Sequence, residues 1–200
     1  MSFIKRELFF QIFGEPIVPD NLLNSLLRND FEPLLAFSQN FQPKTVIEIG
    51  IHKGFTAKCL LKNCTWIKKY IGIDVPPDFK TPLTIQQHEV PLIAGELVRN
   101  EPRVEIIIKP NGSRDIDPAD LPTADLIFID GDHSSKGVLY DTFLAREAIK
   151  KGGIICWHDY GNPLVPSVTH IIDYLNSTEG NHICQIEGSM LCFQFCRDGR

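Results

Sequence analysis

The sequence predicts a single α/β domain in which helices cover both faces of a mainly parallel β-sheet, the doubly wound arrangement. Two observations carry this prediction: apolar runs alternate with helix-like segments between residues 45 and 175, and each run ends at glycine or polar residues. Such alternation is typical of parallel sheets. A third observation is that two apolar runs near the end of the chain flank Glu187-Gly188-Ser189-Met190. Four residues leave no room for a helix, so an antiparallel hairpin is expected there.

The elements follow in chain order from their local patterns. Short, apolar runs rich in β-branched residues predict strands at Thr45–Ile49, Tyr70–Asp74, Val104–Ile108, Leu126–Ile129, Gly153–Trp157, Ile183–Ile186 and Leu191–Phe195. Helical spacing and caps predict helices at residues 21–27 behind an N-cap at Asp20, then at Phe31–Gln39, Phe55–Lys62, Ser135–Lys150 and Val165–Leu175. The long stretch between residues 75 and 103 predicts a loop at Pro76–Gln87 and a helix around Pro91–Arg99. Residues 1–40 are expected to form an N-terminal helical cap segment on a domain of residues 41–200.

Composition excludes several classes of function. The chain has 200 residues, is 43% hydrophobic and carries a formal net charge of -5. Nucleic-acid binding requires clustered Lys and Arg, which this chain lacks, so no nucleic-acid partner is expected. No apolar run reaches the length of a membrane span and no signal peptide is recognisable, so we expect a cytoplasmic protein with no membrane partner. The six cysteines are expected to be buried free thiols; the less favoured alternative is a zinc site at His182, Cys184, Cys192 and Cys196.

The first motif with chemical content is the strand-to-helix turn Glu48-Ile49-Gly50-Ile51-His52-Lys53-Gly54. Glycines at such a turn let a ligand approach the backbone. The dinucleotide fingerprint needs a glycine where His52 stands, and Glu48 would oppose a pyrophosphate. The turn therefore favours a cofactor with positive charge and no phosphate, such as S-adenosylmethionine. A tight turn without any ligand is the alternative.

Two further strand ends fit the same kind of cofactor. Asp74 closes the second strand 24 positions after Gly50, where a carboxylate can accept hydrogen bonds from both hydroxyls of a ribose. Asn111-Gly112-Ser113 follows the third strand, and its side chains could read the edge of an adenine. Each segment also fits an ordinary strand end or turn.

The fourth predicted strand ends in Asp130-Gly131-Asp132-His133-Ser134. Close carboxylates repel each other and need a cation, a donor network or solvent. Histidine titrates near neutral pH, so His133 is a candidate general base. Asp132 or Ser134 is expected to cap the next helix.

The fifth strand ends in Trp157-His158-Asp159. If the fourth and fifth strands are neighbours, Asp130 and Asp159 converge, and with His158 they form a candidate site for Mg²⁺ or Mn²⁺. Such an ion would orient a substrate hydroxyl and lower its pKa. A polar strand end without a metal is the alternative.

Together these motifs resemble the class I S-adenosylmethionine-dependent methyltransferases. More narrowly, they resemble the small-molecule O-methyltransferases with an IDGDH motif, the methyltransferase family 24 type. The resemblance covers roughly residues 31–163 and rests on Glu48-Ile49-Gly50 with Gly54, Asp74, Ile129 to Ser134 and Gly152 to Asp159. It implies a Rossmann-like sheet of seven strands, mainly parallel, with an antiparallel strand in the C-terminal hairpin.

The resemblance also implies roles for individual residues. Glu48, Gly50 and Gly54 would line the methionine part of the cofactor, Asp74 its ribose, and Asn111 to Ser113 its adenine. The full set of expected cofactor-binding residues is Glu48, Gly50, His52, Gly54, Asp74, Asn111, Ser113 and Asp130. Metal-dependent members similar to this chain place a metal ligand at Asp130, a base at His133 and an acidic pair after the fifth strand. Here that pair is His158-Asp159, a departure that leaves the need for a divalent ion open.

The prediction is an enzyme that moves the methyl group of S-adenosylmethionine to a hydroxyl of a small-molecule acceptor. His133 is the expected base, and Asp130 the expected positioning group for a metal or the hydroxyl. One alternative is a nicotinamide-dependent oxidoreductase, which Asp74 permits but Glu48 and His52 oppose. Another is a catalytically silent binding protein of the same fold. The sequence identifies neither the acceptor nor the oligomeric state, and a homo-oligomer stays open.

Overall fold

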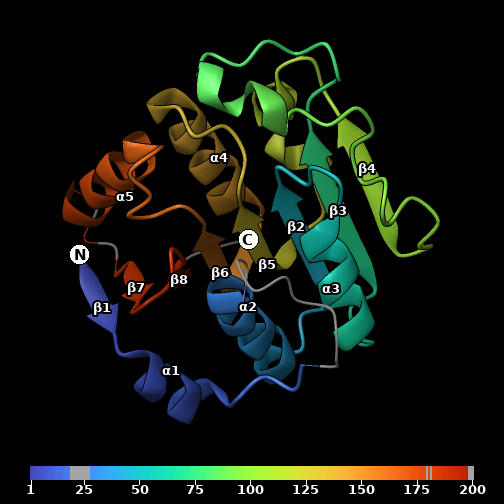
Figure 1. Cartoon of the computed structure of the whole chain (residues 1–200). Coiled ribbons are helices and arrows are strands. Elements are labelled where there is room, and N and C mark those ends of the chain that lie inside the picture. Colours follow the sequence, from blue (N-terminus) through green and yellow to red (C-terminus); the bar gives the residue numbers. More distant parts are fainter. Residues whose placement is uncertain (19–27, 179, 181, 198–200) are drawn as a thin grey trace.

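The computed structural model describes residues 1–18, 28–178, 180 and 182–197, and its centre is a twisted β-sheet (Figure 1). The eight described strands follow the order β1-β7-β8-β6-β5-β2-β3-β4 across the sheet. They are β1 (Ser2–Ile4), β2 (Thr45–Ile49), β3 (Lys69–Asp74), β4 (Val104–Ile108), β5 (Ala124–Ile129), β6 (Ile149–Trp157), β7 (Cys184–Ile186) and β8 (Cys192–Phe195). The predicted strands are all present, with small differences at their ends.

The sheet is parallel except at β8, which runs antiparallel to both β6 and β7. The predicted doubly wound α/β sheet with a C-terminal hairpin is therefore confirmed. The count of seven strands is one too low, because β1 pairs in parallel with β7. β1 has only three residues, most of them exposed, so the sequence shows no alternation from which a strand could be predicted.

Helices cover both faces of the sheet, as Figure 1 shows. α1 (Arg6–Phe13), α2 (Arg28–Phe41) and α3 (Phe55–Asn63) pack on one face, and α4 (Ser135–Ala148) and α5 (Pro166–Thr178) on the other. Successive strand residues point to opposite faces. In β2, Val46 accordingly joins the first core, whereas Ile47 and Ile49 join the second.

The predicted helices between residues 31 and 175 are confirmed except one. The expected helix at 21–27 lies outside the described residues. The segment Pro91–Arg99 forms turns instead of a helix. Gly95 there has φ +67°, and the N–H groups of Gly95 and Leu97 donate to the carbonyls of His52 (2.7 Å) and Lys53 (2.9 Å). Backbone N–H groups that donate to the neighbouring glycine turn cannot also form the hydrogen bonds of a helix. A local sequence pattern does not reveal such a contact, because the two segments are far apart in the chain.

The described residues also form three short 3-10 helices: η1 (Thr84–Glu89), η2 (Gly112–Asp115) and η3 (Pro118–Asp120). η1 lies where the sequence predicts the end of a loop.

α2 is part of the core and is not a separate layer. Leu34, Leu35 and Phe37 are fully buried, and the ring of Phe37 lies 4.9 Å from that of Phe193 on β8. Burying each such side chain stabilises the fold by about 1.5–3 kcal/mol. The division of the chain at residue 40 stays a prediction.

Two expectations about the surface and the cysteines can be compared with the described residues. None of the described helices has the length and apolar character needed to cross a lipid bilayer. All six cysteines are free. Within the described part of the chain, His182, Cys184, Cys192 and Cys196 form no group that could hold a metal ion, so the zinc alternative has no support.

Candidate active site

A cavity of about 480 Å³ opens at the carboxyl ends of the central strands. Ile73, Ile49, Ile129 and Trp157 are paired across β3, β2, β5 and β6. The residues that follow them, Asp74, Gly50, Asp130 and His158, therefore lie along one edge of the sheet, and all four line the cavity. Its volume falls within the range of about 300–1,000 Å³ that small-molecule sites occupy.

The glycine turn packs against the end of β5 with no side chain between them. Gly50 has φ +88°, and a Cβ there would collide with the carbonyl of Asp130 and lie 2.7 Å from the Cα of Gly131. His52 also adopts a left-handed conformation, with φ 48°, which is uncommon for a residue other than glycine. Its position in the turn is stabilised because its N–H donates to Asp74 Oδ2 (2.7 Å).

Asp74 is fixed at the cavity edge by backbone donors. In addition to His52, the N–H of Val75 donates to Asp74 Oδ1 (2.8 Å). Burial raises the pKa of Asp74, and these two backbone donors partly oppose that rise. The side chain lines the cavity, and each of its oxygens keeps lone pairs for a ligand.

Glu48 and Gly54 do not line the cavity. Glu48 is 2% exposed and its Oε2 accepts a hydrogen bond from the Tyr70 hydroxyl (2.8 Å). Burial raises the pKa of Glu48 well above its usual range, despite the Tyr70 hydroxyl. A Cβ on Gly54 would lie 2.8 Å from Val98 and 3.3 Å from Gly95. Their assignment as cofactor-binding residues stays a prediction.

Two histidines and two aspartates form a cluster at the ends of β5 and β6, which we call the Asp-His cluster: Asp130, His133, His158 and Asp159. His133 Nε2 lies 2.8 Å from Asp159 Oδ2 and 3.7 Å from Asp130 Oδ1. His158 Nδ1 lies 3.1 Å from Asp130 Oδ1 and 3.3 Å from Asp159 Oδ2. The structure thus brings together the residues that the sequence predicts for acid–base and metal chemistry.

The local backbone helps to aim Asp159 into this cluster. Asp159 has φ 63°, a left-handed conformation that costs energy and is often found at functional sites. Its Oδ1 accepts a hydrogen bond from Asn162 Nδ2 (2.6 Å), which leaves Oδ2 facing the two histidines.

Charge pairing dominates the titration of the cluster. Burial alone would favour neutral imidazole, but Asp130 and Asp159 outweigh it and raise the pKa of His133 to about 10. The same carboxylates, with Asp30, raise the pKa of His158 well above its usual range. In turn, the histidines lower the pKa values of Asp130 and Asp159 despite burial. The two carboxylates therefore favour the protonated form of His133, which cannot accept a proton from a substrate.

Three members of the cluster fit a metal ion by geometry. Asp130, His133 and Asp159 each offer one ligand atom, and these atoms lie within 4.8 Å of one another. A mixed set of carboxylate and imidazole donors suits Mn²⁺ or a similar transition metal better than Mg²⁺. In this arrangement His133 completes the set, whereas the sequence prediction used His158.

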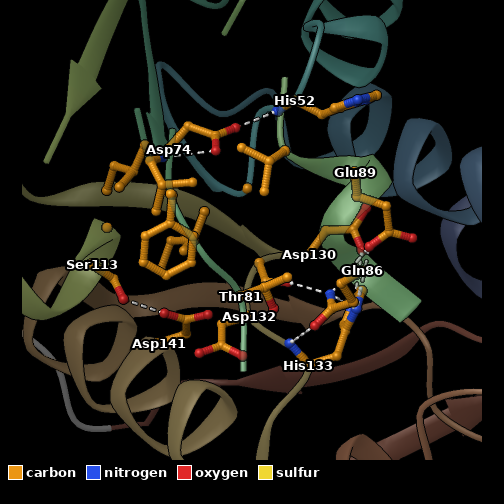
Figure 2. Close-up of a pocket in the computed structure, with 18 of the residues that line it drawn as sticks. His52, Asp74, Thr81, Gln86, Glu89, Ser113, Asp130, Asp132, His133 and Asp141 are labelled. Carbon is orange, nitrogen blue, oxygen red and sulfur yellow. Dashed lines mark hydrogen bonds and ion pairs between the residues drawn. The ribbon is translucent and has the colours of Figure 1, made fainter. Parts of the chain in front are cut away.

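Several cavity residues were missed by sequence reasoning. Gln86 and Glu89 belong to η1. Gln86 Oε1 accepts a hydrogen bond from the backbone N–H of His133 (3.2 Å), and the amide nitrogen of Gln86 also contacts the imidazole nitrogen Nδ1 of His133 (Figure 2). No local motif announces them. Asp141, which also lines the cavity, is different, because it is an acid on the buried face of α4; Asp30 on α2 does not line the cavity, but it lies 3.5 Å from His158. For Asp141 that signal is readable in the sequence, because it lies on the apolar stripe of a predicted helix with Val138 and Ala145.

The remaining predicted residues have defined partners. Asn111 and Ser113 line the cavity, with Asn111 Nδ2 donating to Asp115 Oδ1 (3.0 Å). Asp132 pairs with Arg114 and accepts the Ser134 N–H (2.9 Å). Ser134 Oγ accepts the N–H of Gly137 (3.1 Å) and caps α4. The prediction of a helix cap at this tip is confirmed.

Comparison with known proteins identifies sequence and structural relatives. A family model described as a methyltransferase domain matches residues 47–160. An uncharacterized protein of Acanthamoeba polyphaga mimivirus is 28% identical over 182 residues, which cover 86% of this chain and 73% of the viral protein.

The fold is shared with several solved methyltransferases. The calicheamicin methyltransferase CalS11 has a TM-score of 0.66 at 13% identity and covers 96% of this chain and 91% of its own. An SAH-bound methyltransferase of Podospora anserina has a TM-score of 0.62 at 15% identity, with coverages of 88% and 81%. A putative caffeoyl-CoA O-methyltransferase of Staphylococcus aureus has a TM-score of 0.62 at 14% identity, with coverages of 95% and 90%.

Proposed function

The chain belongs to the methyltransferase-domain family, and we propose that it transfers the methyl group of S-adenosylmethionine to a hydroxyl of a small-molecule acceptor. One observation carries this proposal: Asp74, the Gly50 turn and the Asp-His cluster line a single cavity. Asp74, which can bind a ribose, and the Asp-His cluster, which can accept a hydroxyl proton, can thus both contact a cofactor and an acceptor bound in the same cavity.

The charge of the cavity supports this cofactor over a dinucleotide. Among the described residues, six carboxylate side chains line the cavity, together with no lysine and a single arginine, Arg114, which already pairs with Asp132. The imidazoles of His133 and His158 also line the cavity, but each already faces Asp130 and Asp159. A pyrophosphate would therefore find no unpaired cation among these residues, whereas a sulfonium and an ammonium would be attracted. The bare backbone at Gly50 leaves room for close approach of the cofactor.

In the proposed reaction the chain positions its ligands and manages one proton. When bound, S-adenosylmethionine supplies a methyl group on a sulfonium. The acceptor oxygen–carbon bond forms as the carbon–sulfur bond breaks, so the hydroxyl proton must leave. Alignment of the reacting atoms within the cavity provides much of the rate. Asp130 is proposed to orient the hydroxyl and His133 to take its proton.

The raised pKa of His133 sets a condition on this role. A general base works best when its pKa is near the operating pH. A cationic cofactor next to Asp130 would lower the pKa of His133, because it repels imidazolium and competes for the carboxylate. Cofactor binding would then prepare the base. If Asp130, His133 and Asp159 instead held an ion, the ion would lower the pKa of the acceptor hydroxyl, and His133, as one of its ligands, would not take the proton.

The same charge distribution bears on the acceptor. Among the structural relatives, one is described as a putative caffeoyl-CoA O-methyltransferase. The carboxylate-rich cavity of this chain is unfavourable for a phosphate-bearing acceptor. We therefore propose that the acceptor is a neutral or cationic molecule with a hydroxyl group. For the protein itself we propose a cytoplasmic location and no nucleic-acid partner, on the grounds of composition given above.

Calorimetry with purified protein tests the proposal. S-adenosylmethionine and S-adenosylhomocysteine (SAH) should each bind at one site per chain, and NAD⁺ should not. Binding of NAD⁺ without binding of SAH would instead support the nicotinamide-dependent oxidoreductase. Tight SAH binding combined with no methyl transfer to a broad panel of hydroxyl acceptors would favour a catalytically silent protein of this fold.

A further inference from the structure

α4 exposes an apolar stripe on the face that it turns away from the sheet. Leu139 is 39% exposed, Tyr140 43% and Phe143 58%, whereas the opposite face of the same helix is buried. α4 packs beside α5 on the outside of the sheet (Figure 1). One exposed leucine or ring is ordinary, but three neighbouring ones on a single helix face indicate a contact surface.

The exposed residues of α4 follow the spacing of a helix–helix seam. Four of them are four, three and four positions apart, and we call them the α4 seam: Lys136, Tyr140, Phe143 and Glu147. This is the spacing with which one helix packs against another along a coiled coil. The α4 seam carries two aromatic rings at its centre and one charge of each sign at its ends.

The α4 seam is self-complementary when two copies of it run antiparallel. Its midpoint lies between residues 141 and 142. A two-fold axis at that point places Lys136 of each copy opposite Glu147 of the other, and Tyr140 opposite Phe143. Opposite charges then meet at both ends and apolar rings meet at the centre, as a two-fold contact between identical surfaces requires.

The two terminal charges of the α4 seam oppose the dipole of their own helix. Lys136 lies in the first turn of α4, at the positive end of the dipole, and Glu147 lies in the last turn, at the negative end. Within the described part of the chain neither forms an ion pair, and Lys136 lies over the ring of Tyr140 (5.9 Å). In an antiparallel pair of helices, each charge lies near the end of opposite sign of the other helix. Placement that is unfavourable in one chain is thus favourable in two.

We propose that the α4 seam is the contact surface of a homodimer, in which two copies of this chain pair their α4 helices antiparallel. The matching of charge to charge under the two-fold axis identifies the partner as a second copy. Standard interfaces between proteins bury about 1,200–2,000 Å² in total. A contact centred on one helix of 14 residues lies at the small end of this range, so the dimer should dissociate in the micromolar range.

Analytical ultracentrifugation of the full chain between about 1 and 500 μM tests the proposal. The wild type should show a monomer–dimer equilibrium. Lys136→Glu and Glu147→Lys each place like charges opposite one another, so each should raise the dissociation constant at least about tenfold. An equimolar mixture of the two variants should associate about as tightly as the wild type, because both ends of the mixed pair again carry opposite charges.

Matched controls separate the contact from net charge and from folding. Lys62→Glu, at an exposed position of α3 on the other face of the sheet, changes the net charge as Lys136→Glu does and should leave the dissociation constant unchanged. Both reversals on α4 agree with the dipole of that helix, so below the dissociation constant their melting temperatures should equal or exceed that of the wild type. Phe143→Ser should raise the dissociation constant at least about tenfold, because a ring at the centre of the contact is lost.

Two outcomes would overturn the proposal. A wild-type protein that stays monomeric up to about 500 μM would leave the α4 seam to another partner or to solvent. A dimer that persists in both charge-reversal variants, or a mixture of them that fails to associate, would show that the copies meet through another face.

Discussion

Replacing Gly50 by alanine should damage the site through the backbone alone. Gly50 has φ +88°, and an added Cβ would lie 2.6 Å from the carbonyl carbon of Asp130 and 2.7 Å from the Cα of Gly131. These atoms belong to the backbone, so they cannot rotate away as a flexible side chain would. The substitution must shift the end of β2, the end of β5, or both, and Asp130 moves with β5.

The expected magnitude has two parts. A left-handed conformation costs an alanine about 1–2 kcal/mol. The collision adds roughly 1–3 kcal/mol, as overpacking does in well-packed cores. For a chain of this size, each kcal/mol lowers the melting temperature by about 2–4 °C.

A matched control separates these two parts. Gly152 has φ +78° and nothing within 4 Å of the position of a Cβ, so Gly152→Ala carries the conformational cost without the collision. In thermal unfolding, Gly50→Ala should melt about 2–12 °C below Gly152→Ala. Its affinity for SAH should fall at least about tenfold, while that of Gly152→Ala stays unchanged. Equal melting temperatures and equal affinities for the two variants would refute this reasoning.

Three further predictions concern the cavity. Asp74→Asn should weaken SAH binding by about tenfold or more in calorimetry, because a charged acceptor of ribose hydroxyls is lost; unchanged affinity would remove Asp74 from the site. Because the folded-state pKa of His133 is raised to about 10, its stabilising contribution is complete below pH 6.5 and is lost as the pH rises toward 10. Denaturant unfolding should show this loss, on the order of 5 kcal/mol, and the free energy of unfolding of His133→Gln should change less over the same pH range. If Asp130, His133 and Asp159 hold an ion, Mn²⁺ should raise the melting temperature of the wild type and not of Asp159→Asn.

The sequence predicts which residues surround the cavity because each central strand ends in, or is directly followed by, a glycine or a polar residue. The buried runs that lead to Asp74, Asp130 and His158 are short and apolar, and in-register pairing then places their ends side by side. Because the strands are parallel and joined by helical crossovers, their carboxyl ends all lie at the same edge of the sheet.

The parts that were missed depend on tertiary contacts. Gln86 reaches the cluster from a 3-10 turn that has no periodic pattern. The turns at Pro91–Arg99 exist because Gly95 and Leu97 use their N–H groups to hold the glycine turn. The protonation state of His133 is also set by its neighbours in space, since Asp159 lies 26 positions away in the chain and 2.8 Å away in the structure.

A crystal structure of the protein in complex with SAH would test the central claim most directly. The account predicts SAH in the cavity at the carboxyl ends of the strands, with its ribose hydroxyls on Asp74, its base near Asn111 and Ser113, and its sulfur toward Gly50 and the Asp-His cluster. SAH bound elsewhere, or bound without contact to Asp74, would contradict it.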